Sequence, residues 1–321
     1  MEKPVIKEFL LPEGKLRAPR IALLSRAMFP YHSRVMSGFL RRVEARPDLN
    51  WRPIVFFCKE PRVDVMHEQM QEIRNDKYDL VISIGALYSS VVAEHVRGKK
   101  LTVPFIFSGV TDPFRIGILP ADGSQEGITG VVREQIPYTW LADFLAIIRR
   151  NIKRVLIPYY QNSELGHLEE RLRMLADTFA MYDVHVVLMP VGTVDDVVPS
   201  VLRHMGVIDT IIIPEGSFVA DLTVAISKLC KQYHVMLVAH TMEQSTASIA
   251  VTFTQDIAQL GEALFDIAGK ILIDGKKPSE IPILTLPNDR KIIVDVAACV
   301  EQRVDLDPIA LFCLNESIVI R

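Results

Sequence analysis

The chain has 321 residues, of which 49% are hydrophobic and 23% are charged, and its formal net charge is −3. This composition indicates a globular protein, and the length suits two domains of ordinary size better than a single core. The slightly acidic balance disfavours a nucleic-acid partner, and the sequence contains no run of 18 apolar residues that would predict a membrane-spanning helix.

Strand-like and helix-like segments alternate from residue 20 onward. In the first half we predict strands at residues 21–25, 51–58, 79–84 and 103–107, and helices at 31–44, 63–75 and 89–96. This alternation predicts a parallel sheet with helices on both faces. Right-handed crossovers then place the carboxyl ends of the strands along one edge, where open α/β sheets bind ligands.

The segment 103–131, VPFIFSGVTDPFRIGILPADGSQEGITGV, separates the two halves. We expect the strand at 103–107 to break at Ser108-Gly109, ahead of Thr111-Asp112-Pro113 and a stretch of small and polar residues. A second strand is expected at 128–132. We interpret the stretch between them as a crossover between two sheets.

After this segment the alternating pattern restarts. We predict helices at residues 138–150, 163–182, 194–204, 218–233 and 256–273, and strands at 154–158, 184–190, 210–213, 235–239 and 248–253. Two similar α/β halves joined in mid-chain predict two lobes around a cleft. No short-period repeat is visible, which excludes a solenoid.

The cysteines and histidines suggest no metal or redox centre. The four cysteines are expected to be buried small apolar residues, since they form no CxxC pair; they are Cys58, Cys230, Cys299 and Cys313. The eight histidines are scattered, with neither HxxxH nor HExxH spacing. We therefore predict no metal and no cofactor.

Several motifs resemble the substrate-binding proteins of a bacterial ABC-importer family, of which several members take up tryptophan or related amino acids. The most specific pair is the Thr111-Asp112-Pro113 segment and the ending KILxxGKKPxxIP at residues 270–282. The weaker matches, in the expected order, are Gly38-Phe39, Asn162-Ser163, Ile213-Pro214-Glu215 and Gly269-Lys270-Ile271-Leu272. Together the matches span roughly residues 20–315.

This resemblance implies a type I periplasmic-binding-protein fold, α/β, with two Rossmann-like parallel-sheet lobes joined by three crossovers. The N-terminal lobe would comprise residues 16–125 plus about 254–284, and the C-terminal lobe residues 126–253 plus about 285–321. The helix at 256–273 would thus return to the first lobe. The implied function is the extracytoplasmic solute-binding component of an ABC importer, which captures an amino-acid-like ligand, aromatic in the favoured case, by hinge closure. Its partners would be that ligand and an ABC permease or a signalling protein, and the chain would be monomeric and not an enzyme.

Candidate ligand-binding residues of the first lobe follow the ends of its strands: Phe29, Tyr31, His32, Ala86, Leu87, Ser89, Ser108, Thr111 and Asp112. Helix N-termini offer unpaired N–H groups that suit a ligand carboxylate, and Phe29, Tyr31 and His32 would form an aromatic wall in the loop after the first strand. Alternatively, Ser89 caps its helix, Asp112 forms an Asx turn before Pro113, and Phe29 packs under the loop.

The candidates of the second lobe are Tyr159, Asn162, Ser163, Glu215, Ser217 and His240. Tyr159 would stack on a ring or donate its hydroxyl group, whereas Asn162 or Ser163 alternatively caps the following helix. Glu215 stands where the resembled family has an aspartate, and its carboxylate would pair with an α-ammonium group. His240 is either a ligand contact or a satisfied polar residue at a strand end.

Two alternatives remain open. An enzyme with two Rossmann-like domains, such as a glycosyltransferase, would need an acid–base set or a nucleotide site, and neither is visible: Gly123, Gly127 and Gly130 form no phosphate loop. A ligand sensor would share the fold. The first 20 residues do not resemble a secretory signal, so we expect a periplasmic or membrane-anchored protein if a signal is missing from this sequence, and a cytoplasmic one otherwise.

Overall fold

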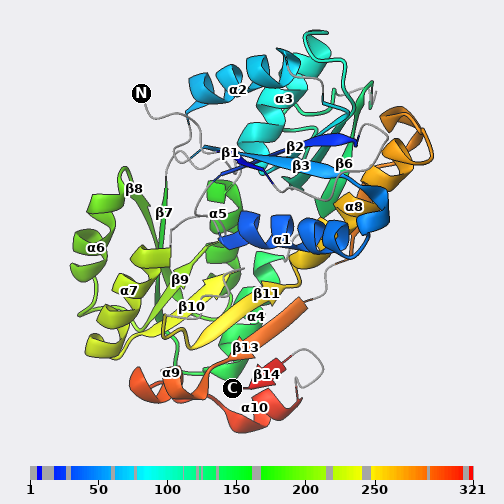
Figure 1. Ribbon diagram of the computed structural model, residues 1–321. Helices are drawn as coiled ribbons and strands as arrows, with labels where there is room; N and C mark the ends of the chain where they lie inside the picture. The colour runs from blue at the N-terminus through cyan, green and yellow to red at the C-terminus, as the bar shows by residue number, and fades with distance from the viewer. Residues whose placement is uncertain are drawn as a thin grey trace. The chain divides into compact units, whose positions relative to one another are not determined.

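A computed structural model describes residues 6–8, 18–26, 30–58, 62–75, 78–110, 112–120, 123, 126–134, 137–160, 168–214, 220–240, 247–287, 290–313 and 318–320. The chain forms two compact units (Figure 1). Unit 1 comprises Met1–Gln135 and Asp256–Pro287, and unit 2 comprises Ile136–Gln255 and Asn288–Arg321. The chain therefore passes from one unit to the other three times.

The described part of unit 1 contains a seven-stranded sheet with the order β1-β3-β2-β4-β5-β6-β12. Its strands are β1 (Ile6–Glu8), β2 (Arg20–Arg26), β3 (Arg52–Cys58), β4 (Leu80–Ile84), β5 (Phe105–Val110), β6 (Ile128–Arg133) and β12 (Leu284–Leu286). Neighbouring strands are parallel except for β1, which runs antiparallel to β3.

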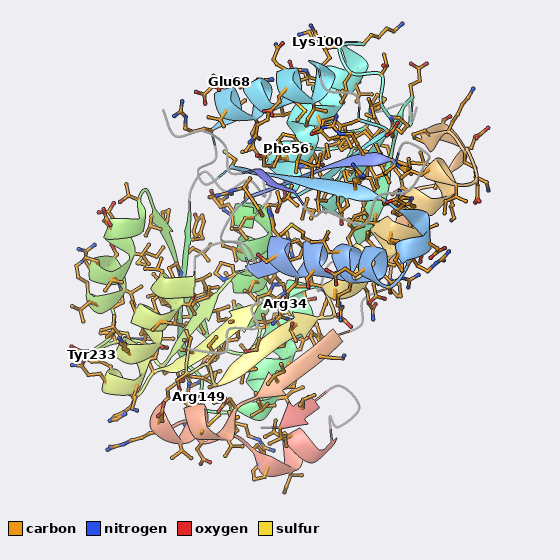
Figure 2. The ribbon with its side chains drawn as sticks, in the orientation of Figure 1. Arg34, Phe56, Glu68, Lys100, Arg149 and Tyr233 are labelled. Carbon is orange, nitrogen blue, oxygen red and sulfur yellow. The ribbon has the colours of Figure 1, made fainter. Side chains whose placement is uncertain are left out.

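Helices cover both faces of this sheet. Helices α1 (Pro30–Glu44) and α8 (Ala258–Leu272) pack on one face, and α2 (Val63–Asn75) and α3 (Ala86–Arg97) pack on the other. Strand β2 shows why: Ile21 and Leu23 belong to the first core, whereas Ala22 and Leu24 belong to the second. Alternate residues of a strand point to opposite faces, so a strand that is buried on both faces is apolar throughout. Phe56 of β3, labelled in Figure 2, lies in the second core.

Two glycines let α1 and α8 approach closely, and the two helices lie side by side in Figure 1. A Cβ atom on Gly38 of α1 would lie 2.2 Å from the carbonyl oxygen of Ala258. A Cβ atom on Gly261 of α8 would lie 2.0 Å from the carbonyl oxygen of Val35. The backbones are thus in direct contact, and this contact holds the returning segment in unit 1.

Unit 2 has a similar architecture, and its described residues form a sheet with the order β14-β13-β11-β10-β9-β7-β8. These strands are β7 (Arg154–Tyr160), β8 (His185–Val191), β9 (Thr210–Ile213), β10 (Met236–His240), β11 (Val251–Gln255), β13 (Arg290–Val294) and β14 (Ile318–Ile320). Helices α4 (Tyr138–Ile148), α5 (Leu168–Ala180), α9 (Val296–Glu301) and α10 (Pro308–Cys313) contribute to one core. Helices α6 (Val194–Leu202) and α7 (Ala220–Tyr233) contribute to the other.

The predicted α/β fold with parallel sheets in two lobes is confirmed, but the expected crossover after residue 107 is wrong. Strand β6 pairs in parallel with β5, so the segment between them stays within unit 1. The chain leaves unit 1 only after Gln135. Cys58, Cys230 and Cys299 are buried thiols, as expected, while the side chain of Cys313 lies outside the described residues. Within the described ranges, no helix is long and apolar enough to span a membrane.

Candidate functional site

The candidate site of unit 1 lies where the winding of its sheet reverses. The chain passes from β2 through α1 to β3 on one side, and then through α2 to β4 on the other side of β2. Because β3 and β4 flank β2, the helices that follow β2 and β4 lie on opposite faces of the sheet. The carboxyl ends of two such strands border the crevice in which doubly wound folds bind ligands.

His32 lies at this point, in the first turn of α1. The predicted helix at 31–44 is confirmed within one residue, since α1 begins at Pro30, a residue whose fixed φ favours the first helical position. The loop position that we also expected for the rings of Tyr31 and His32 is therefore wrong. The His32 Nδ1 atom accepts a hydrogen bond from the Arg26 N–H at the end of β2, at 3.2 Å. This bond places the ring proton on Nε2. Burial, together with the nearby positive charge of Arg26, lowers the pKa of His32 to about 3, so the ring is neutral at physiological pH.

Gly85 forms the turn between β4 and α3 and lies against the His32 ring. Its φ is +100°, and a Cβ atom there would lie 2.6 Å from the Cε1 atom of His32. Both features require glycine. The Gly85 N–H donates a hydrogen bond to the carbonyl oxygen of Ser108 at 2.8 Å, which ties the ends of β4 and β5 together.

Ser89, in the first turn of α3, stabilises the Gly85 turn by a hydrogen bond. We expected a helix from residue 89, with Ser89 as a ligand contact or alternatively as the helix cap, but α3 begins at Ala86 and Gly85 is its N-cap residue. The fully buried Ser89 hydroxyl group donates to the Gly85 carbonyl oxygen at 2.7 Å and lies 2.7 Å from the Ser83 hydroxyl oxygen. Its hydrogen-bonding capacity is therefore used within the protein.

The Gly85 N-cap offers no side chain to the N–H groups of the first turn of α3. The first N–H groups of a helix have no partner within it. Ala86 and Leu87, both half-buried, supply two of these groups, and no described residue accepts a hydrogen bond from them. Together with the positive end of the helix dipole, they suit an oxygen atom of a bound ligand.

Ser108 lies beside this turn, inside strand β5. The predicted end of the strand at Phe107 is wrong, since β5 continues to Val110 with a register irregularity between Ser108 and Val110. Gly109, with φ of +70°, provides this bend and packs against Tyr31: a Cβ atom on it would lie 3.0 Å from the Cε1 atom of Tyr31. The Ser108 hydroxyl oxygen is fully buried and has no hydrogen-bond partner among the residues that the structure describes. A buried hydroxyl group without a partner is costly, so this one keeps an unused capacity to donate and accept hydrogen bonds.

Asp112 lies further along the chain and stabilises a turn. Its Oδ1 atom accepts hydrogen bonds from the N–H groups of Phe114, at 3.1 Å, and of Arg115, at 3.0 Å. The Asx turn, one of the two alternatives for Asp112, is therefore confirmed. The candidates Phe29 and Thr111 lie outside the described residues. Of the predicted first-lobe set, the structure thus brings together Tyr31, His32, Ala86, Leu87, Ser89 and Ser108.

In unit 2, two of the six candidates are described. We expected Tyr159 to follow its strand, but it lies within β7 and its ring is in the core. His240 is the last residue of β10 and is fully buried, with its ring centroid 5.0 Å from that of Tyr138. The remaining four, Asn162, Ser163, Glu215 and Ser217, lie outside the described residues.

Two side chains that the sequence did not suggest join His240. Tyr138 is the first residue of α4, and the guanidinium carbon of Arg171, in α5, lies 4.4 Å from the centroid of its ring. Arg171 precedes the helix midpoint by a few residues and shows no motif, so only the packing of α5 on α4 reveals it. Among the described residues of both units, no group of three or more metal-ligating side chains is present.

Comparisons with known proteins agree with this architecture. The family model described as "ABC transporter substrate binding protein" matches residues 62–311. A Streptococcus pneumonia ABC domain, solved in complex with L-Trp, is similar in structure, with a TM-score of 0.76 at 14% identity over 94% of this chain and 100% of that chain. None of the curated proteins compared with the chain matches it in sequence.

Two further solved structures show the same fold. A conserved domain protein from Vibrio cholerae has a TM-score of 0.78 at 14% identity, over 95% of this chain and 99% of that chain. The ligand-free, open structure of a substrate binding protein with adhesive properties from Clostridium difficile has a TM-score of 0.62 at 17% identity, over 95% and 99%. These likenesses show a type I periplasmic-binding-protein fold. Because the family model matches most of its length, the chain belongs to the ABC transporter substrate binding protein family.

Proposed function

We propose that this protein captures a small amino-acid-like solute for an ABC importer and does not alter it chemically. The observation that carries the proposal is the donor cluster at the crevice of unit 1. There Ser108, whose hydroxyl group is buried, accepts a hydrogen bond from the Gly85 N–H through its carbonyl oxygen, and Gly85 directly precedes the first turn of α3 with the N–H groups of Ala86 and Leu87. These groups donate hydrogen bonds to ligand oxygen atoms without any reorganisation of the protein.

The state of His32 favours binding over catalysis. A general base works best when its pKa lies near the working pH. The pKa of His32 is about 3, and its Nδ1 atom is engaged by the N–H of Arg26. The ring is therefore a neutral structural element that positions the Gly85 turn.

The favoured ligand is an aromatic amino acid. Tyr31 and His32 present two rings near the donor cluster, with centroids 5.9 Å apart, and aromatic rings pack well against a planar side chain. The fold is also shared with a protein that was solved in complex with L-Trp. In this proposal the protein works outside the cytoplasm beside an ABC permease, and ligand capture involves closure of the two units.

A thermal-shift screen against amino acids, sugars and nucleotides tests this function. A ligand at about 100 times its dissociation constant stabilises the folded protein by roughly 2.7 kcal/mol. We expect stabilisation by one or more aromatic amino acids, which are recovered unchanged. Stabilisation by sugar nucleotides alone, accompanied by product, would instead establish an enzyme.

A pair of serine substitutions separates binding from folding. Ser108→Ala removes an unpartnered buried hydroxyl group, so we expect an unchanged or slightly higher free energy of unfolding and about tenfold weaker ligand binding. Ser89→Ala leaves the buried Ser83 hydroxyl group without its partner and should cost about 1–3 kcal/mol of stability. Urea unfolding and calorimetric titration measure both quantities. A destabilised Ser108→Ala variant with full affinity would contradict the assignment of Ser108.

A further inference from the structure

Three side chains from separate elements meet at the carboxyl edge of the sheet in unit 2. Tyr138 begins α4, Arg171 is the fourth residue of α5, and His240 ends β10. The Arg171 guanidinium carbon lies 4.4 Å from the Tyr138 ring centroid, and the Tyr138 and His240 rings are 5.0 Å apart. The edge at which parallel strands end is the one that binds ligands in open α/β sheets.

Arg171 holds a positive charge there without an anionic partner among the described residues. One terminal nitrogen of its guanidinium group is buried and has no hydrogen-bond partner in the described ranges. Its contact with the Tyr138 face is a cation–π interaction, which fixes the plane of the guanidinium group but does not satisfy its N–H donors. A buried N–H group without an acceptor is destabilising unless something else supplies that acceptor.

Two other arginines of unit 2 show the ordinary arrangements. Arg173, two residues further along α5, is exposed and lies 2.6 Å from the carboxylate of Glu169. Arg149, labelled in Figure 2, ends the same helix that Tyr138 begins, and so lies at the opposite edge of the sheet. It is buried, and its Nε atom also lacks a partner among the described residues, but one of its terminal nitrogens donates hydrogen bonds to the Asp209 carbonyl oxygen at 2.8 Å and to the Thr210 hydroxyl oxygen at 2.9 Å. Within the described part of the chain, Arg171 differs from both in having neither a carboxylate nor a carbonyl partner.

We propose that Arg171, held on the face of Tyr138, forms an anion-binding subsite in unit 2 that takes the carboxylate of the ligand. The guanidinium group presents parallel N–H donors that match a carboxylate in a bidentate pair, whereas a neutral amide or a hydroxyl group offers fewer acceptors and no charge. This inference rests on the proposed function and specifies its ligand class: an organic acid, with the carboxylate required for tight binding.

The test compares matched ligands on matched variants. L-tryptophan, L-tyrosine and L-phenylalanine are each titrated calorimetrically against their carboxamides and their decarboxylated amines, with wild type, Arg171→Gln, Arg171→Lys and Arg173→Gln. We expect wild type to prefer the carboxylate by about 30-fold or more. In Arg171→Gln the preference over the carboxamide should fall to within about threefold, while part of the preference over the amine remains, because the donors of unit 1 still favour a ligand that has an oxygen atom. Arg171→Lys should retain part of the preference over the carboxamide, and Arg173→Gln should leave it unchanged.

The remaining outcomes overturn the inference in distinct ways. A preference that survives in Arg171→Gln assigns the carboxylate to another group. If Arg171→Gln weakens the binding of acids and of carboxamides equally, Arg171 has a structural role only. If the wild-type protein binds inorganic phosphate or sulfate tightly, the subsite serves a different class of anion than carboxylates. If the wild-type protein binds amines or carboxamides as tightly as acids, the subsite is refuted while the proposed function stands. If none of these compounds stabilises the wild-type protein, the proposed function fails and this inference fails with it.

Discussion

Gly261→Ala should reduce the free energy of unfolding by more than about 3 kcal/mol, because it forces α8 away from α1. The new Cβ atom would lie 2.0 Å from the Val35 carbonyl oxygen and 2.5 Å from the Phe39 nitrogen. Both are backbone atoms, so no side-chain rotation relieves the clash. Separation of the helices would also loosen the packing of Phe265 against Phe39 and Trp51, whose ring centroids lie 6.3 Å and 4.9 Å from its own.

Gly269→Ala on the same helix is the matched control. A Cβ atom at Gly269 would meet only the Ile273 Cδ1 atom, at 3.9 Å. The change should therefore stabilise the protein by up to about 1 kcal/mol, the usual gain when alanine replaces glycine inside a helix. Urea unfolding followed by circular dichroism measures both variants. Equal effects at the two positions would mean that the close helix contact does not govern stability.

Much of the fold could be predicted from the sequence because strands buried on both faces are apolar runs. The predicted helix at 63–75 and the strand at 210–213 match α2 and β9 in their bounds. Neither prediction needed information from distant parts of the chain. The return of α8 to unit 1 did need such information, and it came from the family resemblance rather than from periodicity.

The candidate site was harder to predict because long-range contacts shape it. Ser108-Gly109 has the composition of a turn, yet it lies in β5, where the Gly85 N–H donates to Ser108 and β6 pairs alongside. Ser89 resembles a cap, yet the backbone of Gly85, with a positive φ, starts the helix three residues earlier. Here tertiary hydrogen bonds override local preference.

Other residues of the site carried weaker signals. Pro30 could have indicated that α1 begins before Tyr31, since proline is favoured at the first helical position. Arg171 and Tyr138 carried no such signal. Their proximity depends on how α5 packs on α4, and a single sequence does not specify which helix faces meet.

Acidification should destabilise the wild-type protein more than a His32→Asn variant. The pKa of His32 is about 3 in the folded protein, whereas an unfolded histidine titrates near 6.5. Below pH 6.5 the unfolded chain therefore binds a proton that the folded protein does not. The contribution of the neutral His32 ring to the free energy of unfolding is therefore fully present above pH 6.5 and is lost as the pH falls toward 3. By pH 4.5, two pH units below the unfolded value, this single group should cost about 2.7 kcal/mol.

Asparagine is the appropriate replacement because its side-chain oxygen can accept the Arg26 N–H bond that His32 Nδ1 accepts, yet it does not titrate. The other titrating groups, including His95, whose pKa is lowered mainly by burial, are common to both proteins and cancel in the difference. Urea unfolding at pH 7.0 and pH 4.5 should thus give a loss that is about 2–3 kcal/mol smaller in the variant. Parallel losses would show that His32 becomes protonated within the folded protein, and a ring charged near neutral pH would reopen the case for acid–base chemistry at the Gly85 turn.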